Sequence, residues 1–118
     1  MVKPSLELID DLLERGVNEV IVREILREKL LSGQTLRVKL GIDPTSTKIH
    51  LGRSIPLLKL RDFQELGHQA IFIVGDCTGV IGDTSDKDSE RPMLSPEQVA
   101  NNMKEYFNQA GKIIDLKR

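Results

Sequence analysis

The sequence has little of what marks several classes of protein. It holds a single cysteine, Cys77, so no disulfide can form within the chain, which fits a reducing compartment. Asp76 and Thr78 beside it supply no positive charge, so Cys77 is most simply a small buried side chain. No apolar run approaches the roughly 20 residues of a membrane-spanning helix, and no signal-peptide pattern opens the chain. These absences predict a cytoplasmic protein without a membrane partner.

The sequence also lacks an excess of charge of either sign. Lysine and arginine total 17 against 18 aspartate and glutamate residues, and aromatic residues make up only 3%, with no tryptophan. A protein that grips nucleic acid usually carries a basic surface for the phosphates or aromatic side chains for the bases. Any RNA partner must therefore be held mainly by other parts of a protein. The content of 39% hydrophobic residues is that of an ordinary globular domain.

Two short amphipathic helices are predicted at the start of the chain. Ser5 can cap the first, whose apolar residues recur at helical spacing until Gly16 stops it. Asn18 can cap the second, from Glu19 to about Leu31. The charged residues of both helices are most simply a solvated face. Residues 1–34 are therefore expected to form an amino-terminal helical segment.

A strand, a helix and a second strand are predicted to follow. The segment 37–42 alternates apolar and polar or small residues, as a half-buried strand would, and Pro44 then ends the ladder. A helix should begin near Gly52 or Arg53 and run to Leu66, with Pro56 tolerated in its first turn. The apolar segment 69–74 fits a parallel strand that is covered on both faces.

The last third of the chain begins with a loop rich in glycine and aspartate. Ser95-Pro96-Glu97-Gln98 then forms a capping box for a helix that runs to about Ala110, and residues 112–115 could begin another strand. His68, directly after the preceding helix, is expected at the surface. The predicted fold class is α/β, a partial Rossmann-like nucleotide-binding fold with a parallel sheet and flanking helices, preceded by the two short amino-terminal helices.

The carboxyl end of the first strand is the candidate binding site. Asp43, Thr45, His50 and the backbone of Gly52 gather there, where a helix start presents N–H groups and a positive dipole end to an anion. A lone histidine at a helix start is more simply satisfied by a neighbour. Beside a glycine that lets a nucleotide approach, however, His50 can donate to a phosphate whose charge grows in the transition state.

These residues carry a resemblance to a known family. Four blocks resemble, in order, motifs of the tyrosyl-tRNA synthetases among the class I aminoacyl-tRNA synthetases, namely 43–53 with Asp-Pro-Thr and His-Leu-Gly, 59–68, 75–83 and 89–92. The resemblance covers essentially the whole chain. It implies that residues 35–118 are the first half of a class I catalytic domain. It also implies a tyrosine–tRNA ligase, which activates tyrosine with ATP to tyrosyl-adenylate and transfers it to tRNA.

The same resemblance implies a role for individual residues. Four would be catalytic, two at the strand end and two in a mobile loop that closes over the leaving pyrophosphate: Thr45, His50, Lys87 and Arg91. Six would bind ATP: Gly41, Asp43, Thr45, His50, Gly52 and Arg53. Three would bind tyrosine, with Asp83 on its α-ammonium: Asp43, Thr78 and Asp83. No protein metal site is expected, and Mg²⁺ would accompany ATP as part of the substrate.

Three positions depart from the pattern of the family. Arg53 stands where the usual motif has a second histidine; an arginine can still reach a phosphate or ribose oxygen, or it can mark a lost function. Asp86 replaces a glycine that many relatives have beside Lys87, which makes that loop less permissive. Lys39 occupies a position where some members have a tyrosine that reads the substrate hydroxyl, and it receives no role.

Other family features do not occur in the sequence. The second signature, Lys-Met-Ser-Lys-Ser, is absent, as is an anticodon-binding domain. The resemblance therefore implies an amino-terminal fragment that is inactive or weakly active alone, from an enzyme that is a homodimer at full length and holds tRNA through absent regions. One alternative is a stand-alone ATP- or adenylate-binding paralogue without aminoacylation activity. Another is a structural piece that associates through an exposed sheet edge.

Overall fold

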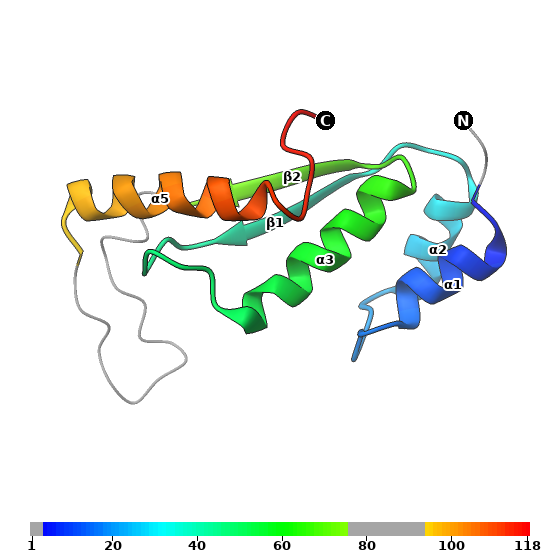
Figure 1. The fold of residues 1–118 in the computed structure, drawn as a ribbon. Coiled ribbons are helices and arrows are strands. Elements are labelled where there is room, and N and C mark those ends of the chain that lie inside the picture. The colour runs from blue at the N-terminus through cyan, green and yellow to red at the C-terminus, as the bar shows by residue number, and fades with distance from the viewer. Residues whose placement is uncertain (1–3, 76–93) are drawn as a thin grey trace.

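The computed structural model describes residues 4–75 and 94–118, and its fold is α/β (Figure 1). The described elements, in chain order, are α1 (Leu6–Glu14), α2 (Arg23–Leu31), β1 (Arg37–Ile42), α3 (Leu51–Glu65), β2 (Gln69–Val74) and α5 (Pro96–Ala110). β1 and β2 pair in parallel, from Arg37 opposite Gln69 to Ile42 opposite Val74. The predicted partial Rossmann-like arrangement, with two helices ahead of a parallel sheet and its flanking helices, is confirmed.

The two amino-terminal helices differ in how well their starts were predicted. Ser5 caps α1, since its Oγ accepts the N–H of Leu8 at 3.3 Å. The predicted start of α2 at Glu19 is wrong, because α2 begins at Arg23 and its N-cap is Val22, with φ 58° and ψ 53°. Val20 packs against the core between the two helices, and this contact keeps the residues before Val22 out of the helix.

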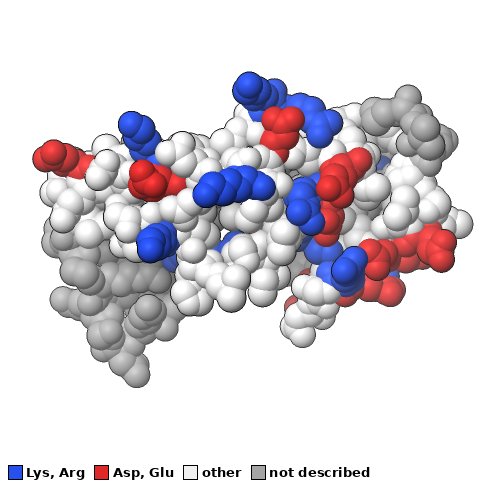
Figure 2. All heavy atoms as spheres, viewed as in Figure 1, with Lys and Arg blue, Asp and Glu red and all other residues white. Residues whose placement is uncertain are grey.

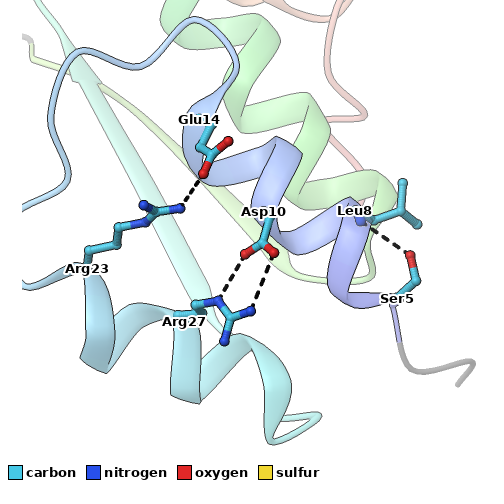
Figure 3. Close-up of polar contacts among 6 residues, drawn as sticks. All are labelled: Ser5, Leu8, Asp10, Glu14, Arg23 and Arg27. Atoms are coloured by element: carbon cyan, nitrogen blue, oxygen red, sulfur yellow. Dashed lines mark hydrogen bonds and ion pairs between the residues drawn. The ribbon is translucent and has the colours of Figure 1, made fainter.

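Ion pairs join α1 to α2 on their exposed sides (Figure 3). Arg23 donates to Glu14 at 2.8 Å, and Arg27 donates through Nε and Nη2 to the two carboxylate oxygens of Asp10 at 2.9 and 3.4 Å. The hydrogen bond from Arg27 lowers the pKa of Asp10. Some charged side chains of the predicted solvated face therefore form ion pairs that join α1 to α2.

The hydrophobic core has two parts, and α3 contributes to both. Phe63 of α3 and its C-cap Leu66 pack against the first cluster, formed by Ile9, Leu12, Leu13 and Leu30. The second cluster joins α3 to α5 and to the turns that follow it, through Leu57, Leu60, Ala110 and Ile114. Lys59 Nζ also donates to the carbonyl oxygen of Leu12 at 2.8 Å. Helix α3 therefore packs both against the amino-terminal helices and against α5.

Within the described part of the chain, helices cover one face of the sheet. Val38, Leu40, Ala70 and Phe72 pack against the second cluster, and the ring of Phe72 meets Phe107 of α5 edge-on. On the other face Ile73 is 45% exposed. The prediction that β2 is covered on both faces is therefore wrong for these residues, because side chains of α3 and α5 pack against the same face.

The segment after α5 forms turns, so the strand predicted at 112–115 is wrong. The N–H groups of Ile113 and Ile114 both reach the carbonyl of Ala110 at 2.9 Å. The side-chain amide of Gln64 in α3 then brackets Asp115, donating to its carbonyl at 2.8 Å and accepting its N–H at 2.9 Å. These contacts hold the segment against the end of α3, where it pairs with no described strand.

His68 is buried, at 8% exposure, and the prediction of a surface position is wrong. Gly67 before it has φ 93°, a left-handed conformation that turns the chain at the end of α3. The His68 ring then lies beneath the start of β1, where Nδ1 accepts the N–H of Leu36 at 3.1 Å. Burial lowers the pKa of His68.

The visible surface carries acidic and basic side chains side by side (Figure 2). This mixture agrees with the nearly balanced charge of the sequence, a formal net charge of −1. None of the helices in the described ranges is long and apolar enough to span a membrane.

Candidate active site

The candidate site starts where β1 ends, at a tight turn. Thr45 donates its N–H to the carbonyl of Asp43 at 2.9 Å across the fully buried Pro44, which is the pattern of a three-residue turn. Pro44 thus ends the ladder as predicted. Asp43 and Thr45, both half-buried, are held at the carboxyl end of the sheet.

His50 is the N-cap of α3, which begins at Leu51, one residue before the predicted start. Its Nδ1 accepts the N–H of Gly52 at 3.0 Å, so the first turn of α3 is closed by the imidazole itself. In a neutral imidazole whose Nδ1 accepts, the proton is on Nε2. The exposed ring of His50 can therefore donate from Nε2 to an anion. The prediction that Pro56 lies in the first turn is therefore wrong, because α3 begins at Leu51 and Pro56 falls in its second turn.

Gly52 makes this position of the histidine ring possible. A Cβ at Gly52 would lie 3.2 Å from Nδ1 of His50, closer than most side chains tolerate, and at an ordinary contact distance of 3.6 Å from Cε1. Any larger residue would press on the imidazole that caps the helix. The glycine of the motif thus has a local reason within the chain, besides the close approach of a nucleotide that the sequence predicted.

Arg53 ties the start of α3 back to the end of β1. Its Nη1 donates to the carbonyl oxygen of Asp43 at 3.1 Å, and the side chain is half-buried. The same carbonyl accepts the N–H of Thr45. The arginine that replaces the second histidine of the motif therefore holds the backbone of the turn in this structure.

Polar side chains of α5 hold the rest of the loop, and the sequence reading missed them. Asn102 donates to the carbonyl of Pro44 at 2.9 Å. Gln109 donates to the carbonyl of Thr47 at 2.8 Å and accepts the N–H of Ile49 at 2.7 Å. The hydroxyl of Tyr106 lies 3.4 Å from Ser46 Oγ. The available signal was a row of polar groups at helical spacing on the face of α5 that also carries Val99 and Ala110.

The structure gathers six of the predicted site residues around the junction of β1 and α3: Gly41, Asp43, Thr45, His50, Gly52 and Arg53. Gly41 lies on the exposed face of β1, with open space beside it. Four other predicted residues lie outside the described residues: Thr78, Asp83, Lys87 and Arg91. Cys77 and Asp86 lie there as well.

Three grooves of the described surface lie away from this junction. One, of about 230 Å³, runs between the end of α1 and the outer side of α3; it is lined by Arg15, Gly16, Ile55, Leu58, Lys59, Arg61 and Asp62. None of the six gathered residues lines it. Within the described ranges, no group of three or more His, Cys, Asp or Glu side chains could hold a metal ion. The described part of the candidate site is built from a strand end, a turn and a helix start.

The sequence matches the family model described as tRNA synthetases class I (W and Y) over residues 31–118. The chain belongs to this family of class I tRNA synthetases. The resemblance seen in the sequence is confirmed, and the matched residues include the whole of the β1–α3 junction.

Curated relatives point to one member of the family. The chain is 55% identical over 107 residues to a tyrosine–tRNA ligase of Dehalococcoides mccartyi, 52% over 103 residues to that of Shewanella oneidensis and 48% over 116 residues to that of Chlorobium chlorochromatii. These matches cover 91%, 87% and 95% of this chain but 27%, 26% and 29% of the relatives. The chain thus spans little more than a quarter of the length of the curated relatives it matches.

Proposed function

We propose that this chain is the part of a tyrosine–tRNA ligase that carries the first signature motif of the catalytic domain. The enzyme activates tyrosine with ATP to give tyrosyl-adenylate and pyrophosphate, and then transfers the tyrosyl group to tRNA. The observation that carries the proposal is the 48% to 55% identity to tyrosine–tRNA ligases over nearly the whole chain. The relatives described above are named as ligases, so a stand-alone ATP-binding paralogue is not favoured.

The β1–α3 junction would bind the phosphates of ATP. His50 offers Nε2–H as a donor at the positive end of α3, and Thr45 lies on the adjoining turn. In the activation step, a carboxylate oxygen of tyrosine forms a bond to the α-phosphorus while the bond to the bridging oxygen of pyrophosphate breaks. Such a reaction is accelerated mainly by positioning and by stabilising the charge on the phosphate oxygens. Thr45 and His50 supply donors for this purpose.

The other predicted residues complete the proposal. Gly41, Gly52 and Arg53 would lie beside the nucleotide. The guanidinium of Arg53 donates to the carbonyl oxygen of Asp43, so it would reach the nucleotide either with another of its N–H groups or by giving up this hydrogen bond. Lys87 and Arg91 would neutralise the leaving pyrophosphate. Asp83 would bind the α-ammonium of tyrosine through a charge-assisted hydrogen bond. Asp43 and Thr78 would lie close by in the same pocket.

The partners follow from the same reaction. Mg²⁺ would arrive with ATP, and tRNA would be held by parts of the enzyme other than this chain, whose visible surface carries no field of one sign (Figure 2). The enzyme would work as a homodimer in the cytoplasm.

The proposal is tested by ATP–pyrophosphate exchange in the full-length protein, with tyrosine or tryptophan supplied separately. Tyrosine-dependent exchange with little or no response to tryptophan is the expected result. Tryptophan-dependent exchange would assign the chain to the other branch of its family. No exchange with either amino acid would contradict an activating enzyme.

A further inference from the structure

We propose that α5 is a positioning element for the activation chemistry. Asn102 and Gln109 hold the signature loop, defined here as residues 43–49, so that Thr45 and His50 are in place before ATP binds. This inference rests on the proposed function, because the loop is catalytic only if the protein activates an amino acid. It adds two residues that lie far from the motif in sequence and belong to no pattern that the motif defines.

The evidence begins with the backbone of the signature loop. The loop has left β1 and has not entered α3, so its N–H and carbonyl groups have no ladder or helix to pair with. Three of these groups, the carbonyls of Pro44 and Thr47 and the N–H of Ile49, bond to side-chain amides of α5 at 2.7 to 2.9 Å. The backbone geometry of the loop is thus fixed by a helix that follows it by about 60 residues, as the separations of 58 to 62 residues show.

The position of these side chains on α5 is a second observation. Asn102, Tyr106 and Gln109 are spaced by four and three residues, so they lie on one side of the helix. Asn102 is 6% exposed and Tyr106 is 1% exposed, between the buried Val99 and Ala110. A buried amide is costly unless it is hydrogen-bonded. The partner of Asn102 is the carbonyl of the buried Pro44, so this one hydrogen bond pairs a buried donor of the helix with a buried acceptor of the loop.

The loop is gripped from α3 as well. Arg53 Nη1 donates to the carbonyl of Asp43 at 3.1 Å, at the end of the loop opposite to the one that Gln109 holds. The segment that carries Thr45 and leads into His50 is therefore fixed on both sides. Misplacing a catalytic group by about 1 Å can cost up to roughly 10²-fold in rate. Loss of the α5 bonds should accordingly be seen in catalysis.

Asn102 and Gln109 bond to backbone atoms, so we assign them positioning roles and not catalytic ones. Their loss should lower kcat of tyrosyl-adenylate formation more than it raises KM for tyrosine, because Asp83 lies outside the loop and the backbone of Asp43 is held by Arg53, not by Asn102 or Gln109. A merely structural role would lower the stability of the protein and leave kcat of the folded fraction unchanged.

The first experiment measures the loop directly, in the full-length protein. The N–H of Ile49 has the side chain of Gln109 as its partner. In Gln109→Ala its hydrogen exchange, followed by NMR, should become roughly tenfold faster, the scale of losing one hydrogen bond. The amide of Leu40 in β1 should be unaffected. Asn108→Ala, a change at the adjacent and exposed residue of α5, is the matched control and should leave the Ile49 amide as it is.

The second experiment measures pyrophosphate exchange in the full-length protein. Asn102→Asp removes the donor to Pro44, and Asn101→Asp makes the same change at the neighbouring exposed residue. Gln109→Glu keeps an acceptor for the N–H of Ile49 and loses the donor to the carbonyl of Thr47. Gln109 is less buried than Asn102, so this change disturbs folding less. We expect kcat to fall by about 10-fold to 10²-fold in Asn102→Asp and less in Gln109→Glu. KM for tyrosine should stay within about twofold in each case, and Asn101→Asp should behave as the wild type.

The outcomes separate this inference from the proposed function. Unchanged kcat in folded Asn102→Asp and Gln109→Glu would overturn the positioning role, and unchanged exchange of the Ile49 amide in Gln109→Ala would overturn the contact itself. A wild-type protein that exchanges no pyrophosphate would sink the proposed function and, with it, the catalytic meaning of the loop. Faster Ile49 exchange together with a reduced kcat and an unchanged KM for tyrosine would support the inference.

Discussion

His68 shows how a single buried side chain makes the molecule sensitive to pH. Its Nδ1 accepts the N–H of Leu36 at 3.1 Å, and its Nε2 is buried without a hydrogen-bond partner among the described residues. Protonation would place a charge in this site and remove the lone pair that accepts from Leu36. Burial therefore lowers the pKa of His68 below its ordinary value of 6.5.

The first prediction follows from the sign of that shift. The unfolded chain takes up the proton more readily than the folded protein. The free energy of unfolding therefore has its full value above about pH 6.5 and falls as the pH drops below it. His68→Asn, whose side-chain oxygen can still accept from Leu36, should remove this part of the pH dependence. Urea unfolding of both proteins at about pH 7.5 and about pH 5.5 measures it. Equal losses of stability in the two proteins would contradict the assignment to His68.

At the scale of elements, α2 starts in a strained conformation. Val22 is the N-cap and has φ 58°, the only positive φ at a residue other than glycine within the described ranges. A β-branched residue in this region is disfavoured by about 1–2 kcal/mol, and Val22 offers no side-chain hydrogen bond to the helix. The chain accepts this start because Val20 and Leu26 pack against the core beside α1.

Replacing Val22 should therefore stabilise the protein, which is the second prediction. Val22→Asn introduces a residue that tolerates the left-handed region and caps helices well, so the free energy of unfolding should rise by about 1 kcal/mol. Ile21→Asn is the matched control, since Ile21 is also β-branched, is 83% exposed and has no positive φ. Its effect should lie within about 0.5 kcal/mol. Urea unfolding compares the two, and equal effects would refute strain at Val22.

Elements whose ends are set by neighbouring residues could be predicted from the sequence. The Ser5 cap, the capping box from Ser95 to Gln98 and the alternation along β1 all depend on contacts within a few residues, and all three are confirmed. The contact of His50 with Gly52 has the same local character. For this reason the sequence could place the candidate site at the junction of β1 and α3.

Elements decided by distant contacts could not be predicted in this way. The turns at 112–115 depend on Gln64, 51 residues away, and the burial of His68 depends on Leu36, 32 residues away. The grip of α5 on the signature loop is of the same kind, because its hydrogen bonds join residues 58 to 62 positions apart. Periodicity along the chain carries no information about such pairs.

At the scale of the whole molecule, the described sheet has two strands and one face without a covering helix (Figure 1). On that face Ile73 is 45% exposed, and both strands present an edge that no other described strand pairs. Apolar residues beside unpaired edges favour association with further copies. The third prediction is that the 118-residue chain self-associates at micromolar concentration.

The sheet is identified as the contact by a pair of substitutions. Ile73→Lys places a charge on the open face of β2 and should reduce the mean mass measured by light scattering. Ile21→Lys puts the same charge on an exposed isoleucine at the start of α2, far from the sheet in sequence, and should leave the mass unchanged. A wild-type chain that is a monodisperse monomer would contradict the prediction, as would equal effects of the two substitutions.

The central claim is that His50 uses its two nitrogens for different purposes, with Nδ1 closing the start of α3 and Nε2 donating to the phosphates of ATP. His50→Asn keeps an acceptor near the position of Nδ1 for the N–H of Gly52 but removes the donor at Nε2. His50→Gln can place a donor near Nε2 and loses the cap. The pair therefore separates the two roles.

The most direct measurement is tyrosine-dependent pyrophosphate exchange by His50→Asn in the full-length protein, with its urea unfolding recorded on the same sample. The account predicts a rate lowered by roughly 10²-fold or more, the scale of removing a transition-state donor, and a free energy of unfolding close to that of the wild type. His50→Gln should keep more activity and lose about 1 kcal/mol of stability with the cap. An exchange rate in His50→Asn equal to that of the wild type would contradict the account.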